Sequence, residues 1–185
     1  MAGDYPSFGE IRRAEQELDR MSGEYYLHHD LFSWQWWLLL ILLFVSWIVW
    51  LRLADRSRMK DILLFGSMIT LVIIVLDYTG SELQLWSYAY QLLPFTTHLS
   101  SVDFSVLPVC HMLVYQFCRS WKAFLAANTV MALLFAFVAE PLFVYWDIYL
   151  MDHWEFVYSF PIYIAKAAFL KWLLERISPR KQEFG

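Results

Sequence analysis

The chain has 185 residues, of which 59% are hydrophobic and only 17% are charged. A soluble domain carries roughly a quarter charged residues, so this composition favours a membrane protein over a soluble globular domain. The formal net charge of −4 lacks the basic excess typical of nucleic-acid binding, and we expect the lipid bilayer, and no nucleic acid, as a partner.

Residues 1–33 form a polar segment that precedes the first apolar run. Ser7 and Glu10 have the spacing of a capping box, which predicts the start of a helix. The helix would be amphipathic and lie on the membrane or on the rest of the protein; the alternative is a solvated, partly disordered terminus. Its apolar face consists of Ile11, Ala14, Leu18 and Met21.

Five apolar segments follow, and they predict a single all-α domain over residues 34–178, a bundle of five transmembrane helices. The third segment is short, and we expect neighbouring residues to extend it. Pro141 is expected to stop the fourth span, after which 142–149 either continues the helix past a kink or forms a separate interfacial turn. The expected spans are 34–51, 62–78, 104–118, 121–140 and 157–177, followed by a cytoplasmic tail, 179–185.

The distribution of Lys and Arg predicts the orientation of the bundle. The 52–61 loop, the 119–122 turn and the C-terminal tail contain basic residues, whereas the 79–103 and 141–156 loops contain none. Because basic loops remain in the cytoplasm, we expect the N-terminus outside and the C-terminus inside.

Five ionisable residues fall in or just above the outer half of the bilayer in this threading. Such groups cost several kcal/mol in hydrocarbon unless they are paired or hydrated. Lys166 therefore needs a partner, and we expect Asp77 or Glu140 first and Asp103 next. The set is either a structural network that fixes helix packing or an outward-facing polar pocket that binds a ligand. This candidate polar pocket consists of Asp77, Asp103, His111, Glu140 and Lys166.

A second set of polar and aromatic residues belongs to the same outer face or to the third span. Tyr88, Tyr149 and other aromatics of the outer loops are expected mainly as interface anchors, the alternative being a ring-lined groove for a lipid or sugar. The secondary candidates are Glu82, Trp86, His98, Tyr115, Gln116 and Trp154.

Motifs for catalysis or cofactor binding are absent from the sequence. There is no GxSxG, CxxC or GxxxxGK[ST] sequence, so no catalytic residue is assigned. His98, Asp103, His111 and Glu140 are plausible N/O ligands, but no pair has a recognisable spacing. We therefore expect no metal site and no cofactor.

Several segments resemble a family of small multi-pass membrane proteins from Bacillus-type and Clostridium-type spore-forming bacteria. They include VDFSVLPVCHMLVYQF and EPLFVYWDIYLMDHWEFVYSFPIYI, and the similarity covers most of the chain from about Trp34 onward. The resemblance implies a bacterial inner (cytoplasmic) membrane location and supplies no catalytic role. Its strongest positions are Asp77 with Gly80 and Trp86, Asp103 with Pro108 and Tyr115-Gln116, Glu140-Pro141, and Trp154 with Tyr158.

Two functions are compatible with these features. The first is a non-enzymatic protein that binds a lipid, a membrane-protein partner or a second copy of itself through its outer acidic and aromatic face. The alternative is a small membrane enzyme or proton-coupled transporter that uses the candidate polar pocket. A concave pocket in which those side chains converge would favour the alternative, and internal pairing would favour the first.

Overall fold

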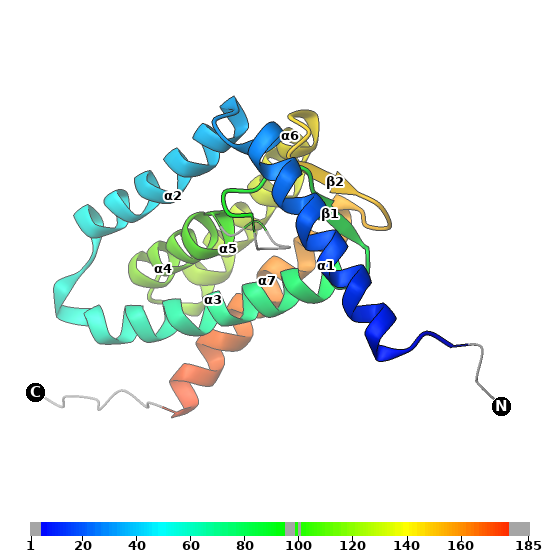
Figure 1. Cartoon of the computed structure of the whole chain (residues 1–185). Coiled ribbons are helices and arrows are strands. Elements are labelled where there is room, and N and C mark those ends of the chain that lie inside the picture. The colour runs from blue at the N-terminus through cyan, green and yellow to red at the C-terminus, as the bar shows by residue number, and fades with distance from the viewer. Residues whose placement is uncertain (1–4, 95–98, 100, 178–185) are drawn as a thin grey trace, which may run out of the picture.

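The computed structural model describes residues 5–94, 99 and 101–177, and this part of the chain is mostly helical (Figure 1). Three π-helical turns, Tyr26–Asp30, Val102–Val106 and Phe135–Ala139, and one 3₁₀ turn, Arg56–Arg58, adjoin the helices. Two short strands, β1 (Trp86–Tyr88) and β2 (Tyr149–Met151), pair antiparallel. The helices are α1 (Phe8–Tyr25), α2 (Trp34–Leu53), α3 (Met59–Glu82), α4 (Leu107–Phe117), α5 (Trp121–Leu134), α6 (Glu140–Tyr145) and α7 (Phe156–Ile177).

Four helical stretches are long and apolar enough to cross a membrane. They are Trp34–Leu53, Arg56–Glu82, Trp121–Tyr145 and Phe156–Ile177. The expected third span is shorter: its π-helical turn and α4 have 5 and 11 residues. They rise about 24 Å, less than the roughly 30 Å of a hydrocarbon core. The general all-α fold is therefore confirmed, with four candidate membrane-spanning stretches in the described residues, and the fifth span stays a prediction.

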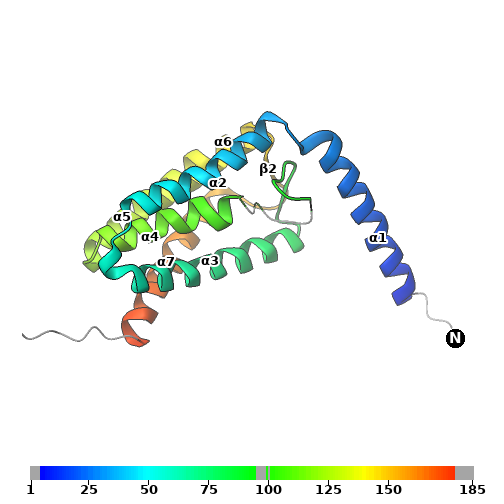
Figure 2. The same ribbon diagram turned by 60° about the vertical axis from the view of Figure 1, so that its left-hand side comes forward.

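The helices surround α4, which lies between the diverging helices α2 and α3 (Figures 1 and 2). The main core forms where α3, α4, α5 and α7 meet. The Phe65 ring stacks on Tyr115 with centroids 4.3 Å apart, and Phe124 packs edge-on against Phe65. A Cβ at Gly66 would lie 2.3 Å from Met112 Sδ, so this glycine permits the close approach of α3 and α4.

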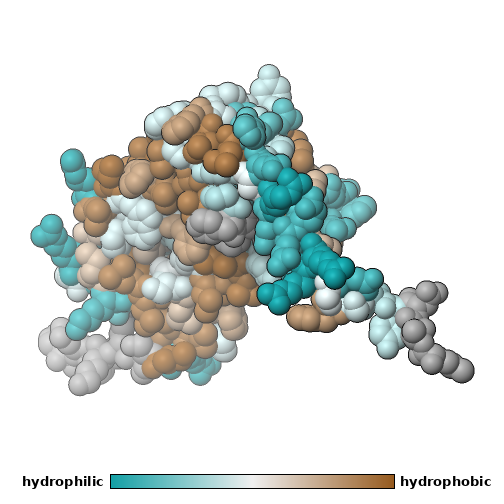
Figure 3. Space-filling view, viewed as in Figure 1, coloured by the Kyte–Doolittle hydropathy of each residue, from teal (hydrophilic) through white to brown (hydrophobic). Residues whose placement is uncertain are grey.

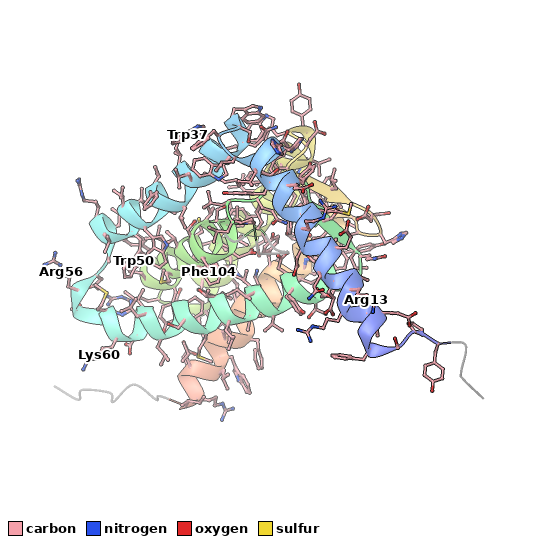
Figure 4. All side chains as sticks on the ribbon, in the orientation of Figure 1. Arg13, Trp37, Trp50, Arg56, Lys60 and Phe104 are labelled. Carbon is pink, nitrogen blue, oxygen red and sulfur yellow. The ribbon has the colours of Figure 1, made fainter. Side chains whose placement is uncertain are left out.

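One end of the bundle, here called the basic end, contains the α2–α3 connection, the α4–α5 turn and the last turns of α7. Gln116 joins the first two: its amide donates to Leu53 O (2.7 Å) and accepts from Asp55 N–H (3.0 Å). Lys171 in α7 donates to Arg119 O at 3.0 Å. Figure 4 shows Arg56 and Lys60 at this end, with Trp37 near the opposite end of α2. The basic loops of the sequence thus lie together.

The opposite end, here called the β end, carries the strands and the start of α2. The junction between α1 and α2 is fixed there by hydrogen bonds to the 91–92 segment. The buried Asp30 carboxylate accepts from Gln91 N–H (3.1 Å), and the Tyr26 hydroxyl donates to Leu92 O (2.9 Å).

Helix α1 leaves the β end and projects from the bundle (Figure 2). Its predicted capping box is present: Ser7 N–H donates to Glu10 Oε2 (2.7 Å), and Glu10 N–H donates to Ser7 Oγ (3.3 Å). No residue of α1 is buried, and its apolar residues Ile11, Leu18 and Met21 are exposed. In Figure 3 the hydrophilic surface of α1 contrasts with the hydrophobic surface of the bundle. The amphipathic helix exists but does not pack its apolar face on the described protein.

Pro141 does not stop the fourth span. The helical path continues through the π-helical turn Phe135–Ala139 into α6, where Glu140 N–H bonds to Phe135 O. A proline cannot donate a backbone hydrogen bond, and the widened π turn precedes it directly. Pro108 follows the π-helical turn Val102–Val106 in the same way. Asp103 lies within the first of these π turns, and Glu140 directly follows the second.

Candidate functional site

A cavity of about 420 Å³ lies in the half of the bundle nearest the β end. Its walls come from α3, the two π-helical turns that precede Pro108 and Pro141, α6 and α7, and from β1, β2 and the segments that flank them. Most of the lining is apolar. The ionisable acidic and basic residues on it are Asp77, Asp103, Glu140 and Lys166, and the aromatic ones are Phe135, Phe143, Trp86, Tyr88, Tyr149, Trp154 and Tyr163.

The cavity reaches the outside of the molecule along α3. Leu76 and Leu83 line it and are 41% and 64% exposed. Leu42 of α2 also lines it. Helices α2 and α3 diverge toward the β end (Figure 1). On the side of the cavity between them the border consists of apolar residues, and these would face lipid because both helices are candidate membrane spans.

Asp77 receives two hydrogen bonds from the β1 strand. The Trp86 indole N–H donates to Asp77 Oδ1 at 2.9 Å, and the Tyr88 hydroxyl donates to the same oxygen at 2.6 Å. Alternate residues of a strand point to the same face, so the two donors of β1 converge. Trp86 also packs against Gly80, where an added Cβ would lie 2.1 Å from the indole ring.

Glu140 receives two hydrogen bonds from α7. Ser159 donates to Oε2 and Tyr163 donates to Oε1, both at 2.9 Å. The Trp154 indole N–H in turn donates to Ser159 Oγ at 3.0 Å. Both oxygens of this carboxylate are therefore held by hydroxyl donors spaced one helical turn apart.

Aromatic contacts connect the surroundings of the two carboxylates. The Trp86 and Trp154 rings meet edge-to-face with centroids 5.0 Å apart. The Tyr88 and Tyr149 rings, paired across the two strands, are stacked at 5.4 Å. These ring pairs close the cavity at the β end.

The tyrosines of the two strands, Tyr88 and Tyr149, remain neutral, and Tyr88 is a hydrogen-bond donor to Asp77. Burial raises the pKa of Tyr88 well above its ordinary value, and the negative charges of Asp77 and Asp103 raise it further. Burial also raises the pKa of Tyr149, with smaller contributions from Glu140 and Asp77. Both effects disfavour an additional negative charge beside the carboxylates.

Asp77 and Asp103 retain buried acceptor atoms. Asp103 is 4% exposed and Asp77 9% exposed, and neither Asp103 Oδ2 nor Asp77 Oδ2 has a hydrogen-bond partner among the described residues. The two carboxyl groups lie within hydrogen-bond reach of one another, so a proton on one of them would be shared with the other; no other described side chain donates to these two Oδ2 atoms. Unpaired buried carboxylate oxygens are costly, so this part of the cavity is suited to a donor from a ligand.

Lys166 has no direct ion-pair partner within 4.0 Å in the described part of the chain. Its Nζ lies 4.4 Å from the centroid of the Tyr163 ring. It interacts electrostatically with Asp103, then Glu140 and Asp77. The expected close pair of Lys166 with Asp77 or Glu140 is therefore absent from the described contacts, although all these groups surround one cavity.

Four of the five candidate pocket residues line the cavity, and His111 does not. The His111 side chain is buried in α4, and neither ring nitrogen has a hydrogen-bond partner among the described residues. The face that a residue occupies depends on the number of residues per helical turn, which differs between π- and α-helices. The eight-residue step from Asp103 to His111 crosses the change from π to α geometry. Sequence spacing therefore could not show which face His111 occupies.

The secondary candidates separate into two groups. Trp86 and Trp154 line the cavity. Tyr115 instead belongs to the core stack with Phe65, Gln116 joins α4 to the end of α2, and Glu82 is exposed at the end of α3. His98 lies outside the described residues.

Ser159 and Tyr163 are site residues that the sequence interpretation missed. Together with Lys166 they recur at steps of four and three residues along α7, which places them on one helix face. This polar spacing in an otherwise apolar span was an available signal. Among the described residues, no group of three or more His, Cys, Asp or Glu side chains could hold a metal ion.

The fold and this site define a helical, multi-pass membrane protein with a carboxylate-lined cavity between its helices. Comparison with known proteins adds no relative to this description: no family model, no curated protein and no solved structure matches the chain. The functional assignment therefore depends on the geometry of the cavity.

Proposed function

We propose that the chain is a multi-pass protein of a bacterial cytoplasmic membrane that binds an amphipathic ligand in the cavity beneath the β end. The observation that carries the proposal is the pair of buried Asp77 and Asp103 oxygens, which have no donor apart from one another's carboxyl group among the described residues, on the wall of an otherwise mostly apolar cavity. Its volume of about 420 Å³ is in the range of small-molecule sites. Polar groups at one place and apolar walls elsewhere suit a molecule with a head group and a tail.

In the proposed topology the β end faces outward and the basic end faces the cytoplasm. The α2–α3 connection and the α4–α5 turn contain Arg56, Arg58 and Arg119, and they lie together at the basic end. The positive-inside tendency supports this orientation. The bacterial location is supported by the resemblance to the membrane-protein family of spore formers.

A small membrane enzyme or proton-coupled transporter is the second candidate. The specific feature that favours it is the convergence of three carboxyl groups and one ammonium group around a single cavity. Ligand binding is nevertheless the more economical proposal, because it requires only the unpaired groups and the cavity. A transporter would additionally need a second opening toward the basic end.

Cysteine accessibility tests the proposal. In a background of Cys110→Ala and Cys118→Ala, Val106→Cys would place a thiol on the cavity wall, and Val109→Cys would place one in the packed core of the same helix. In a non-ionic detergent, we expect a small methanethiosulfonate reagent to modify the first variant at least about tenfold faster. Equal, slow modification of both folded variants would overturn the proposed binding cavity.

A further inference from the structure

The cavity wall carries unpaired groups of both charge signs. Asp77 Oδ2 and Asp103 Oδ2 lack hydrogen-bond partners in the described structure, and Lys166 there lacks an ion pair within 4.0 Å. Building on the proposed function, we propose that the ligand is a zwitterionic amphiphile. Its ammonium group binds Asp77 and Asp103, its anionic group binds Lys166, and its tail lies along the apolar wall.

The two aspartates form the ammonium subsite. Asp77 Oδ1 already accepts hydrogen bonds from Trp86 and Tyr88. These bonds orient the carboxylate and leave Oδ2 available to a ligand. Asp103 presents a second buried oxygen, and the two carboxyl groups are close enough to share a hydrogen bond when one is protonated, which a bound ammonium group would replace. An ammonium group offers three donors and the compensating charge for both. The aromatic rings that close the cavity add faces that favour a cation.

Lys166 forms the anion subsite. The Glu140 oxygens each accept a hydroxyl hydrogen bond, from Tyr163 and Ser159, so Glu140 is already occupied by neutral donors. The Lys166 ammonium lies 4.4 Å from the centroid of the Tyr163 ring and has no ion pair within 4.0 Å in the described residues. A phosphate or carboxylate on the ligand would give it a charged acceptor within the cavity.

A ligand of one charge sign would bind either the aspartate oxygens or the Lys166 ammonium, but not both. A simple amine would leave Lys166 without a direct ion pair, and a simple anion would bring no donor to the aspartate oxygens. Unpaired charges in a membrane interior are costly. A zwitterion satisfies both and carries no net charge into the cavity.

The apolar border determines where the tail would lie. Leu42, Ile73 and Leu76 line the cavity between α2 and α3, and Leu76 is also exposed on the outer surface of α3. A tail placed there would pass from the cavity into the surrounding acyl chains. The favoured source of the ligand is therefore a membrane lipid with an ammonium-bearing head group, and the other source is a free zwitterion without a tail.

Protection of Val106→Cys from modification measures binding to the full chain. Four probes separate the contributions of the ammonium group, the anionic group and the tail to binding. They are lauroyl lysophosphatidylethanolamine, dodecylamine, dodecyl phosphate and tail-free phosphoethanolamine. We expect the lysolipid to protect at concentrations at least about tenfold lower than each of the other three. Equal protection by phosphoethanolamine would overturn the assignment to a lipid and indicate a free zwitterion.

Charge-neutral variants assign the two ends of the ligand. Asp103→Asn is expected to weaken the lysolipid and dodecylamine by about tenfold or more while leaving dodecyl phosphate little changed. Lys166→Met is expected to weaken the lysolipid and dodecyl phosphate but not dodecylamine. The matched controls Asp61→Asn and Lys60→Met, at the basic end of α3, should leave all probes unchanged.

The two proposals fail in different ways. A Val106→Cys thiol that never reacts would contradict the cavity itself. A reactive thiol that all tailed probes protect equally, in the parent and in both charge-neutral variants, would leave an apolar binding cavity and overturn the zwitterion. Asp77→Asn provides a second test of the ammonium subsite if Asp103→Asn does not fold.

Discussion

The Tyr88 hydroxyl donates a 2.6 Å hydrogen bond to Asp77 Oδ1 and thereby joins a three-residue strand to a helix of the bundle. The bond crosses from β1 to the last two turns of α3 and fixes one wall of the cavity. Trp86, on the same face of the strand, donates a second hydrogen bond to Asp77 Oδ1. The cavity therefore depends on a short antiparallel pairing of two strands far apart in the chain as much as on its helices.

Removal of the donors to Asp77 is expected to destabilise the β end. Tyr88→Phe leaves a buried carboxylate with one donor fewer, and we expect the free energy of unfolding to fall by about 1–3 kcal/mol. Trp86→Phe should do the same, and the two effects should be non-additive because the donors share one oxygen. Thermal unfolding in detergent measures both. Tyr158→Phe, at a half-exposed ring on α7, is the control, and an equal loss there would contradict the argument.

Gly80→Ala is expected to displace the Trp86 indole from Asp77. An alanine Cβ would lie 2.1 Å from two carbons of that ring, and overpacking of this kind costs about 1–3 kcal/mol. Thermal unfolding should show the loss, and tryptophan fluorescence should report the changed environment of the indole. Gly23→Ala in α1 is the matched control, because no atom lies within 4 Å of its added Cβ. A stable Gly80→Ala protein with unchanged fluorescence would contradict this packing.

Gln116→Leu is expected to destabilise the basic end without changing the cavity. The substitution removes both hydrogen bonds between α4 and the end of α2, to Leu53 O and from Asp55 N–H. We expect a loss of about 1–3 kcal/mol in thermal unfolding. The modification rate of Val106→Cys should stay the same, since Gln116 does not line the cavity. The exposed Gln16→Leu provides the amide control, and a changed rate in Gln116→Leu alone would give Gln116 a role at the site.

The start of α1 is expected to loosen in acid. Hydrogen bonds from Ser7 lower the pKa of Glu10 below its ordinary value of 4.5. Because the folded-state pKa is depressed, the stabilisation is present above that ordinary value and is lost as the pH falls through the lowered one. Hydrogen exchange of residues 8–12, corrected for the intrinsic pH dependence, measures the change. Ser7→Ala removes the hydroxyl but keeps the backbone N–H donor to Glu10, so it should exchange faster throughout and show a smaller pH response, whereas Ser22→Ala should retain the full response.

Much of the fold follows from local sequence. The apolar runs predict the four long helices because hydrocarbon requires every backbone group to bond within its own helix. The Ser7 and Glu10 capping box is confirmed because it depends only on residues three apart. The prediction that the fourth span ends at Pro141 was wrong. The sequence shows the proline but not the π-helical turn that lets the helical path continue past it.

The sequence by itself determined that this chain belongs in a membrane and that Asp77, Asp103, Glu140 and Lys166 would lie in the same half of it. Depth along a helix needs only a count of residues and a rise per residue. Only the tertiary structure decided that these four share a cavity and that His111 does not, because rotation about a helix axis depends on packing and on the π-helical turns. It also decided that Tyr88, Ser159 and Tyr163 supply the hydrogen bonds, since those contacts join segments far apart in the chain.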